Sequence, residues 1–365
     1  MRKQYDYCIL GAGLAGLSVA KSLIKHGDCS ILIIDPKGIA GGASGSPIGL
    51  VNPATGRYAT KSWKAEEAIH IIKRNFEEVE LSTGKYFYKN SGVIRPAMEQ
   101  KIASRMQENL INTDWPENWC YWLGKHEMSI KFPDLENTEG GLLVNSGMTV
   151  SIPDYLNALA EHLKEDDVDI IEYLDYDLEY NDQNWRITFS DSLESIKADQ
   201  LIVTAGIKSK EFDFLEDLPL IPVKGQVVTF KCEYQFPYDT AVSALGYFAS
   251  MDGKTFVAGS TYEHKFQTEK PDDFGIEYIS NRLFRVIPKL KGKVKLIDQW
   301  SGVRASTPDR MPIVGYHPNF ENCIVFAGLG SKGLLYSAYI GEKIGLYLSK
   351  NNEVLPEEIS INRFL

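Results

Sequence analysis

The chain has 365 residues, of which 44% are hydrophobic and 24% are charged, so it is long enough for two domains with large buried cores. Its 39 lysines and arginines against 49 aspartates and glutamates give a formal net charge of -10, which disfavours nucleic acid as a partner. The five cysteines form no C-x-x-C pair, which argues against structural zinc and a disulfide framework and favours a cytoplasmic protein with reduced thiols.

The first predicted elements are a strand at residues 5–10, a helix at 14–26 and a second strand at 30–34. A positive start followed by an apolar run is also the pattern of a secretory signal. This run, however, contains three glycines, lacks a small-residue cleavage site and leads into the second strand, which favours the folded unit. No other segment approaches the ~20 apolar residues that span a bilayer, so no membrane contact is expected.

The turn between the first strand and helix has the spacing of a dinucleotide-binding site. It reads Gly11-Ala12-Gly13-Leu14-Ala15-Gly16, and its glycines allow a tight turn, approach of a pyrophosphate and close packing of helix on sheet. The N–H groups and dipole at the helix start favour the phosphates. Asp35 ends the second strand, where it can accept hydrogen bonds from ribose hydroxyls and repel a 2′-phosphate, which argues against NADP. A glycine-rich structural turn is the alternative.

The later elements alternate between two kinds of structure. Residues 38–56 are rich in small residues and proline and predict a loop, 63–81 predict a helix, and 86–150 contain short strand-like pieces. The next predicted elements are a helix at 152–163, strands at 169–173, 177–180 and 185–189 with a turn at Asn181-Asp182, and a strand at 198–204. Antiparallel strands are predicted at 222–231, 244–250 and 254–260. A helix at 278–286, a strand at 323–327 and a helix at 334–348 complete the chain. Parallel and antiparallel pieces therefore interleave, which predicts two domains interleaved in sequence.

A second G-x-G-x-x-G spacing, Gly328-Leu329-Gly330-Ser331-Lys332-Gly333, precedes the last predicted helix. A second dinucleotide unit would need a further strand after that helix, ending in an acidic residue, and no such strand is predicted there. The motif alone also fits a purely structural strand–turn–helix.

Motifs throughout the chain resemble the D-amino-acid-oxidase-like family of FAD-dependent oxidoreductases, which includes glycine oxidase and sarcosine oxidase. The residues that carry the resemblance are the N-terminal glycine turn, Gly42-Ala43-Ser44-Gly45, Thr204-Ala205-Gly206, Lys224-Gly225-Gln226, and residues 301–315 and 326–334. Within the family, residues 42–45, 329–334 and Asn362-Arg363-Phe364 are most similar to the flavin module of the bifunctional bacterial enzyme that matures 5-carboxymethylaminomethyl-uridine in tRNA. The methyltransferase half of that enzyme has no counterpart in this sequence.

The resemblance implies an α/β fold in which an antiparallel-sheet substrate domain is inserted into a Rossmann-like FAD-binding domain, of the glutathione-reductase-like, D-amino-acid-oxidase type. We expect residues 1–85, 150–215 and 301–365 to form the FAD-binding domain and residues 86–149 and 216–300 the substrate domain. The expected FAD contacts are Gly11, Gly13, Leu14, Ala15, Gly16, Asp35, Lys37, Ala43, Ser44, Thr204, Ala205, Gly206, Gly302, Gly330, Ser331, Lys332, Gly333 and Leu334.

The resemblance also implies how the flavin is held. The start of the last helix would face the flavin pyrimidine edge, where its N–H groups and positive dipole stabilise the anion of the reduced ring. Gly302 stands where covalent-flavin sarcosine oxidases carry the linking cysteine, so we expect non-covalent FAD. No residue matches the lysine that assists oxygen in those oxidases, which leaves the electron acceptor open.

Two residues are expected to act on the substrate. Arg304 matches the arginine that holds the substrate carboxylate in glycine-oxidase-like enzymes, a role that suits a planar guanidinium. The alternative is an ion pair with Asp309 or another acidic neighbour. Tyr247 matches a substrate-side tyrosine, the alternative being simple packing on a half-buried strand.

The predicted function is FAD-dependent oxidation of a C–N bond in a small amine or amino acid to an imine, which water then hydrolyses. Two alternatives stay open. One is the same chemistry on the carboxymethylaminomethyl group of a tRNA wobble uridine, which the closest motifs favour and the charge of -10 opposes. The other is a non-catalytic flavin-binding protein. The six histidines have no paired spacing, and no metal site is predicted.

Overall fold

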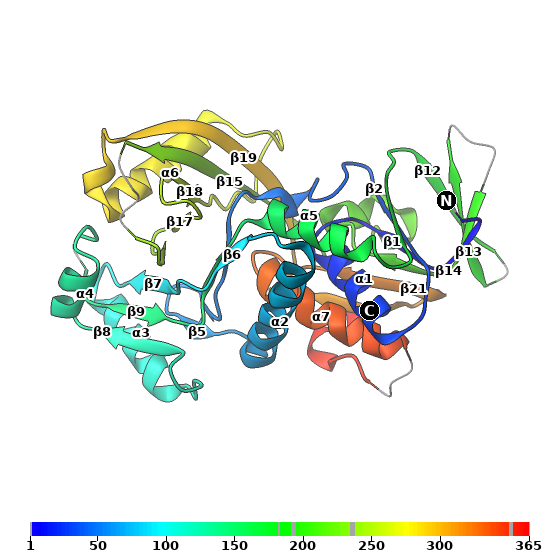
Figure 1. The fold of residues 1–365 in the computed structure, drawn as a ribbon, viewed down its shortest axis with the longest axis horizontal. Coiled ribbons are helices and arrows are strands. Elements are labelled where there is room, and N and C mark those ends of the chain that lie inside the picture. Colours follow the sequence, from blue (N-terminus) through cyan, green and yellow to red (C-terminus); the bar gives the residue numbers. More distant parts are fainter. Residues whose placement is uncertain are drawn as a thin grey trace.

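Two eight-stranded sheets organise the chain in a computed structural model that describes residues 2–136, 138–181, 183–190, 195–233, 238–349 and 353–364. Figure 1 shows them on opposite sides of the molecule, with helices α2 (Ala65–Thr83) and α5 (Ile152–Leu163) in between. No helix in the described ranges combines the length and the apolar character that a membrane span requires.

The first sheet is mainly parallel. Its strands follow the order β11 (Val168–Glu172), β2 (Ile31–Asp35), β1 (Gln4–Leu10), β14 (Ser195–Val203), β13 (Asn184–Phe189) and β12 (Tyr176–Asn181), and β21 (Phe320–Ala327) joins β14 to β20 (Ile313–His317). The neighbouring strands β11, β2, β1, β14 and β21 run parallel to one another. Their carboxyl ends therefore meet at one edge, the usual ligand-binding edge of such sheets.

Both faces of the parallel strands are buried, as continuous apolar runs predict. Ile31 and Ile33 face a core shared with helices α1 (Leu14–His26), α2, α5 and α7 (Gly333–Leu348). Leu32 and Ile34 face a second core around Trp185. Helices α1 and α7, from the two ends of the chain, lie in contact, because a Cβ on Gly341 would meet the backbone of Ser18 at 2.8 Å.

The second sheet is antiparallel except for one pair. Its order is β19 (Val294–Ser306), β15 (Ile221–Cys232), β18 (Thr255–Gly259), β17 (Tyr247–Ser250), β16 (Ala241–Ser243), β7 (Val93–Pro96), β9 (Gly141–Val144) and β8 (Cys120–Leu123), with β16 and β7 parallel. Helix α6 (Asp273–Val286) packs Ile279 and Leu283 against Val228 and Phe230 of β15. This face is therefore core, and the other face is free to border a cavity.

The smaller elements complete the fold. A three-stranded sheet joins β3 (Gly49–Val51), β10 (Met148–Val150) and β6 (Tyr88–Lys89), and β4 (Ala54–Thr55) pairs with β5 (Thr60–Lys61). The short helices are α3 (Gln100–Asn112) and α4 (Lys125–Lys131), and 3₁₀ turns cover Ala43–Gly45, Gly206–Glu211, Asp213–Leu215, Pro288–Leu290, Glu357–Ile359 and Ile361–Phe364.

Two segments differ from the sequence prediction. The loop predicted at residues 38–56 contains strands β3 and β4, because β10 and β5 satisfy their backbone groups despite the small side chains. The segment 86–150 contains helices α3 and α4 as well as strands. In α3, Ala103 and Met106 are buried and Ile102 and Leu110 pack beside them, a helical spacing that was not recognised in the sequence.

Several element boundaries also differ, and two of them have a clear physical cause. Helix α6 begins at Asp273 instead of 278, because the Asp272 carboxylate accepts a hydrogen bond from the Gly275 N–H and so caps the helix. Strand β19, whose sequence is strand-like as far as Gly302, continues to Ser306, since it pairs with β15 as far as Ile221. Of the turn predicted at Asn181-Asp182, Asp182 lies outside the described residues.

Candidate active site

A cavity of about 1280 Å³ lies between the carboxyl ends of the parallel strands and the free face of the antiparallel sheet. Of the predicted site residues, all but Gly16 line it: Gly11, Gly13, Leu14, Ala15, Asp35, Lys37, Ala43, Ser44, Thr204, Ala205, Gly206, Tyr247, Gly302, Arg304, Gly330, Ser331, Lys332, Gly333 and Leu334. Residues more than 300 positions apart in the sequence therefore meet at one cavity. No histidine or cysteine is among the described residues that line it.

Asp35 fixes the glycine turn at the end of β2. One carboxylate oxygen accepts a hydrogen bond from the Ala12 N–H at 2.8 Å and the other from the Lys37 N–H at 2.8 Å. A carboxylate has about four acceptor positions, so both oxygens retain capacity for a ligand hydroxyl. The position of Asp35 on the cavity wall is therefore set by two backbone groups before any ligand binds.

The start of α1 is polar and closely packed. Ser44 accepts a hydrogen bond from the Leu14 N–H at 3.1 Å, and a Cβ on Gly13 would lie 2.8 Å from the same hydroxyl oxygen. Gly16 faces away from the cavity, where a Cβ would collide with the Gly11 carbonyl. Its place in this motif is thus to let the helix pack on the strand.

The start of α7 lies beside the start of α1, because a Cβ on Gly333 would come within 3.1 Å of the Leu14 side chain. Gly328 and Gly330 have φ angles of 74° and 54°, which place the chain in the left-handed region that suits glycine. The Gly330 N–H donates to the Ala305 carbonyl at 2.8 Å, and the helix has no side-chain cap. Its first N–H groups thus face the cavity without a side-chain acceptor. Burial, followed by the charge of Arg310, lowers the pKa of Lys332.

The glycine motif before α7 does not begin a second dinucleotide unit. After α7, the described residues form 3₁₀ turns at Glu357–Ile359 and Ile361–Phe364. They add no strand to the parallel sheet, and their one β-type contact with it is a single bridge between Val314 and Ser360.

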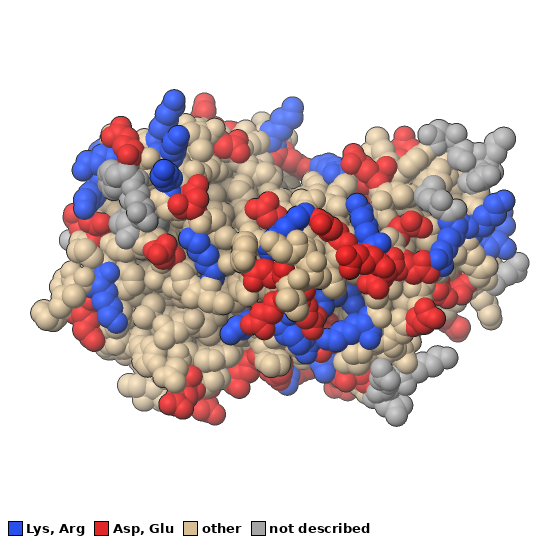
Figure 2. Space-filling model, viewed as in Figure 1, with Lys and Arg blue, Asp and Glu red and all other residues tan. Residues whose placement is uncertain are grey.

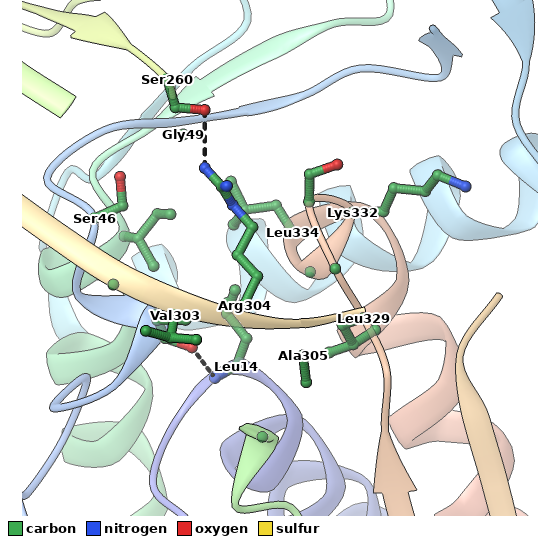
Figure 3. A pocket seen from close by; sticks show the side chains of 18 of the residues that line it. Leu14, Ser46, Gly49, Ser260, Val303, Arg304, Ala305, Leu329, Lys332 and Leu334 are labelled. Atoms are coloured by element: carbon green, nitrogen blue, oxygen red, sulfur yellow. Dashed lines mark hydrogen bonds between the residues drawn. The ribbon is translucent and has the colours of Figure 1, made fainter. Parts of the chain in front are cut away.

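Arg304 projects from β19 across the cavity, as Figure 3 shows, toward Ser260 and away from Lys332. Its guanidinium donates to the Ser260 hydroxyl at 2.8 Å and to the Thr261 carbonyl at 3.3 Å, and it lies 4.7 Å from the Tyr262 ring centroid. Gly225 on the paired strand makes room, because a Cβ there would overlap the guanidinium.

The suggested ion pair of Arg304 with Asp309 is wrong. Asp309 pairs instead with Arg363 at 3.1 Å and accepts hydrogen bonds from the Met311 N–H and the Thr307 hydroxyl. Within the described part of the chain, Arg304 has no carboxylate partner. Its charge is therefore available to a ligand.

Tyr247 lines the cavity on β17. Its hydroxyl donates to the Ile48 carbonyl at 2.7 Å, which leaves the oxygen as an acceptor. Burial raises the pKa of Tyr247 to about 12, although Ser46 and the charge of Arg304 act in the opposite direction. The phenol is therefore neutral at ordinary pH and can position a ligand but not remove a proton from it.

Several cavity residues were missed by the sequence prediction. Ser260 and Tyr262 follow β18, and Trp300 packs on Gly302, where a Cβ would lie 2.5 Å from the indole. Arg95, on β7, is 7% exposed. No local motif marks these residues, since contacts between distant strands bring them to the cavity.

Residues 6–345 match the family model described as "FAD dependent oxidoreductase". The chain belongs to this family. The resemblance inferred from the motifs is thereby confirmed, FAD is the cofactor, and the chain is an oxidoreductase instead of a non-catalytic flavin-binding protein.

The relatives of this FAD-dependent oxidoreductase include longer proteins. The "tRNA 5-methylaminomethyl-2-thiouridine biosynthesis bifunctional protein MnmC" of Hydrogenovibrio crunogenus is 24% identical over 400 residues, covering 96% of this chain and 56% of the relative. The protein of the same name from Maricaulis maris is 26% identical over 340 residues, covering 92% and 50%. The chain therefore spans about half the length of these relatives.

Solved structures share the fold over nearly the whole chain. Glycine oxidase from Geobacillus kaustophilus superposes with a TM-score of 0.87 at 21% identity and covers 99% of both chains. Iminodiacetate oxidase from Chelativorans sp. BNC1 gives 0.83 at 22% identity, covering 97% of this chain and 98% of its own. L-proline dehydrogenase from P. horikoshii gives 0.85 at 15%, covering 100% and 98%. The predicted fold class is thus confirmed.

The cavity fits FAD in size and chemistry. Its volume of about 1280 Å³ exceeds the roughly 300–1,000 Å³ of a typical small-ligand site, which leaves room for a substrate beside the cofactor. Asp35 offers acceptors for ribose, and the start of α1 offers N–H groups for phosphate. The start of α7 offers a positive helix end for the flavin. These individual contacts stay predictions.

Proposed function

We propose that this FAD-dependent oxidoreductase oxidises a C–N bond in an amine that carries a carboxylate. The observation that supports this most directly is Arg304, whose guanidinium reaches into the cavity without a carboxylate partner among the described residues. A planar guanidinium binds a carboxylate in a two-pronged contact.

The chain's own groups would orient the substrate. Arg304 holds the carboxylate and the Tyr247 oxygen accepts a hydrogen bond from the substrate N–H, which fixes the C–H bond that breaks. FAD supplies the acceptor for the hydride that leaves the carbon. The positive end of α7, beside the start of α1, would stabilise negative charge that develops on the bound flavin. Water then hydrolyses the imine to a carbonyl compound and an amine.

The cavity contains no histidine among the described residues that line it. The neutral amine can release hydride directly, so this chemistry does not require a general base. The role of the chain is thus positioning and electrostatics.

The second candidate substrate is the carboxymethylaminomethyl group of a tRNA uridine. The names of the relatives that match over 96% and 92% of the chain favour it. That group is itself a secondary amine with a carboxylate, so Arg304 would hold either substrate in the same way.

Reduction of the flavin under anaerobic conditions tests the proposal, because this measurement does not require the electron acceptor to be known. Sarcosine, glycine, iminodiacetate and 5-carboxymethylaminomethyluridine are mixed with the holoenzyme, and we expect at least one to bleach the flavin. Arg304→Lys should lower kcat/KM for that amine by about 10- to 100-fold, because it keeps the charge but loses the two-pronged contact. FAD affinity should stay near that of the wild type.

The matched control is Arg186→Lys, on an exposed position of β13 far from the cavity lining. Wild-type kcat/KM in Arg304→Lys with a carboxylate-bearing amine would remove Arg304 from the substrate site.

A further inference from the structure

Arg95 is a buried charge without a counter-charge. It is 7% exposed and lines the cavity, where its guanidinium donates to the Gly56 carbonyl and to the Ser243 hydroxyl at 3.2 Å. Its Nε has no hydrogen-bond partner, and within the described ranges no carboxylate pairs with it. Burial lowers the pKa of Arg95 to about 10. A buried cation is costly unless paired, so an anion in the cavity would relieve this cost.

Three more arginines line the same cavity as Arg95: Arg57, Arg282 and Arg285, which with Arg95 we call the arginine group. Arg57 follows Gly56, and Arg282 of α6 donates to the Leu245 carbonyl, two residues from the Arg95 partner Ser243. Only Arg57 has a carboxylate partner in the described chain, Glu99 at 3.5 Å. A locally positive subsite thus exists in a chain whose net charge is -10.

Arg95 lies across the sheet from the residue that Arg304 contacts. Ser243 of β16 pairs with Tyr247 of β17, and Tyr247 pairs with Gly259 of β18, which precedes the Arg304 partner Ser260. Arg95 lies one strand beyond Ser243, on β7, so at about 4.8 Å between strands the backbones of Arg95 and Gly259 are roughly 14 Å apart. The guanidinium groups of Arg95 and Arg304 come closer, because Arg95 reaches Ser243 and Arg304 reaches Ser260, two strands apart. An anion bound by Arg95 would therefore lie beside the Arg304 site and not in it.

We propose that the arginine group binds a phosphate of a nucleotide whose base-borne, carboxylate-bearing amine lies at Arg304. This inference rests on the proposed function, since it uses Arg304 as the site of the reacting amine. Phosphate is the anion favoured here because several guanidinium groups can share its oxygens. The same subsite would give a chain of negative net charge a local contact with a polyanion.

The test compares two probe pairs that each differ by one anionic group. The first pair is 5-carboxymethylaminomethyluridine and its 5′-monophosphate, and the second is sarcosine and iminodiacetate. Each is titrated into the anaerobic holoenzyme, and the dissociation constant is taken from the flavin spectral change, whether a shift or bleaching. We expect the monophosphate to bind about 10- to 100-fold tighter than the nucleoside.

Arg95→Gln and Arg282→Gln should each reduce this phosphate advantage to about 3-fold or less, whereas the control Arg186→Gln should preserve it. FAD content and thermal unfolding are measured for every variant. If Arg95→Gln does not fold, Arg282→Gln decides, because its side chain is only partly buried.

Equal binding of nucleoside and monophosphate by the wild type would overturn the inference. So would an unchanged phosphate advantage in both folded variants. A preference for iminodiacetate over sarcosine that depends on Arg95, without any phosphate advantage, would assign the subsite to a second carboxylate instead. Absence of bleaching by every amine would contradict the proposed function, while a phosphate advantage that depends on Arg95 would still support the subsite.

Discussion

Asp35 both holds the glycine turn and lines the cavity. Its carboxylate holds the glycine turn through the Ala12 and Lys37 N–H groups, and it also lines the cavity beside that turn. Because both oxygens are already oriented by the backbone, a ribose hydroxyl would meet a carboxylate in a fixed position. Asp35 therefore couples the shape of the turn to cofactor binding.

Replacement of Asp35 by Ala should weaken FAD binding by roughly 1.5–3 kcal/mol, the value of a hydrogen bond to a charged group, with the fold retained. Asp35→Asn, which keeps one acceptor oxygen, should lose less. Reconstitution of the apoprotein with FAD measures the dissociation constant, with Asp217→Ala, an exposed site outside the cavity, as the control. An unchanged constant in Asp35→Ala would separate Asp35 from the cofactor.

Single residues differ in how far the sequence reveals their roles. The glycines at 11, 13 and 16 are predictable, since a local strand–turn–helix needs them at that spacing. Arg304 was found only through a resemblance, and its contacts with Ser260 and Tyr262 come from another strand. Arg95 was missed because a buried arginine looks like a surface arginine in sequence; only the tertiary structure reveals its missing counter-charge.

At the scale of elements, a buried polar cluster joins α6 to the antiparallel sheet. Lys224 is fully buried on β15 and donates to Asp272 at 2.8 Å, at the cap of α6. Gln226 donates to the other Asp272 oxygen at 2.8 Å and to Glu263 at 3.0 Å. In the Lys224-Gly225-Gln226 motif, Lys224 and Gln226 thus bind the cap of α6 on one face of β15, whereas Gly225 makes room for Arg304 on the other face.

Asp272→Asn should lower the free energy of unfolding by roughly 1–2 kcal/mol at neutral pH, a modest value because its side chain is partly exposed. The hydrogen bond from Lys224, followed by that from Gln226, lowers the pKa of Asp272 from 3.8 to about 2. A lowered pKa stabilises the folded state above 3.8, and this contribution is lost as pH falls toward about 2. The difference between variant and wild type should therefore shrink in that window.

Urea unfolding at saturating FAD, at about pH 7, about pH 5 and about pH 3, measures this difference. Asp273→Asn, the next residue in the chain, serves as the control. A difference that stays constant down to about pH 3 would show that the charge of Asp272 is not what stabilises the helix cap.

The sequence predicted some elements closely and missed others for physical reasons. Helices α1 and α5 have the predicted bounds because their apolar faces repeat regularly and each is buried along its length. Helix α3 was missed although Ala103, Met106 and Leu110 repeat at helical spacing, because the surrounding segment was interpreted as short strand-like pieces. The full length of β19 was missed because its last residues are strand only through pairing with β15.

At the scale of the whole molecule, charge is distributed without a dominant basic surface. Figure 2 shows acidic and basic side chains interspersed over one face, in keeping with the net charge of -10. We propose the two-domain division with residues 1–85, 150–215 and 301–365 around FAD and the rest around the substrate. The two large sheets support this division, because the strands of the mainly parallel sheet come from the first group of segments and those of the antiparallel sheet from the rest. The exception is β19, which begins before residue 301 and ends after it.

Acid precipitation of the purified yellow protein should release FAD into the supernatant. Gly302 offers no thiol, and none of the described residues lining the cavity is a cysteine or histidine. Chromatography of the supernatant identifies the flavin. Flavin that stays with the precipitate would show a covalent link, and FMN in the supernatant would contradict the assignment of the dinucleotide.

The contact between α1 and α7 sets an order of events during synthesis. The ribosome makes Leu14 at the start of α1 some 320 residues before Leu334 at the start of α7, by subtraction of their positions. At about 5–20 residues per second, roughly 15 to 65 seconds separate them. Until then the glycine turn lacks the helix that packs beside it, so the nascent chain cannot complete the cavity. We therefore expect FAD to be enclosed only after α7 has been translated.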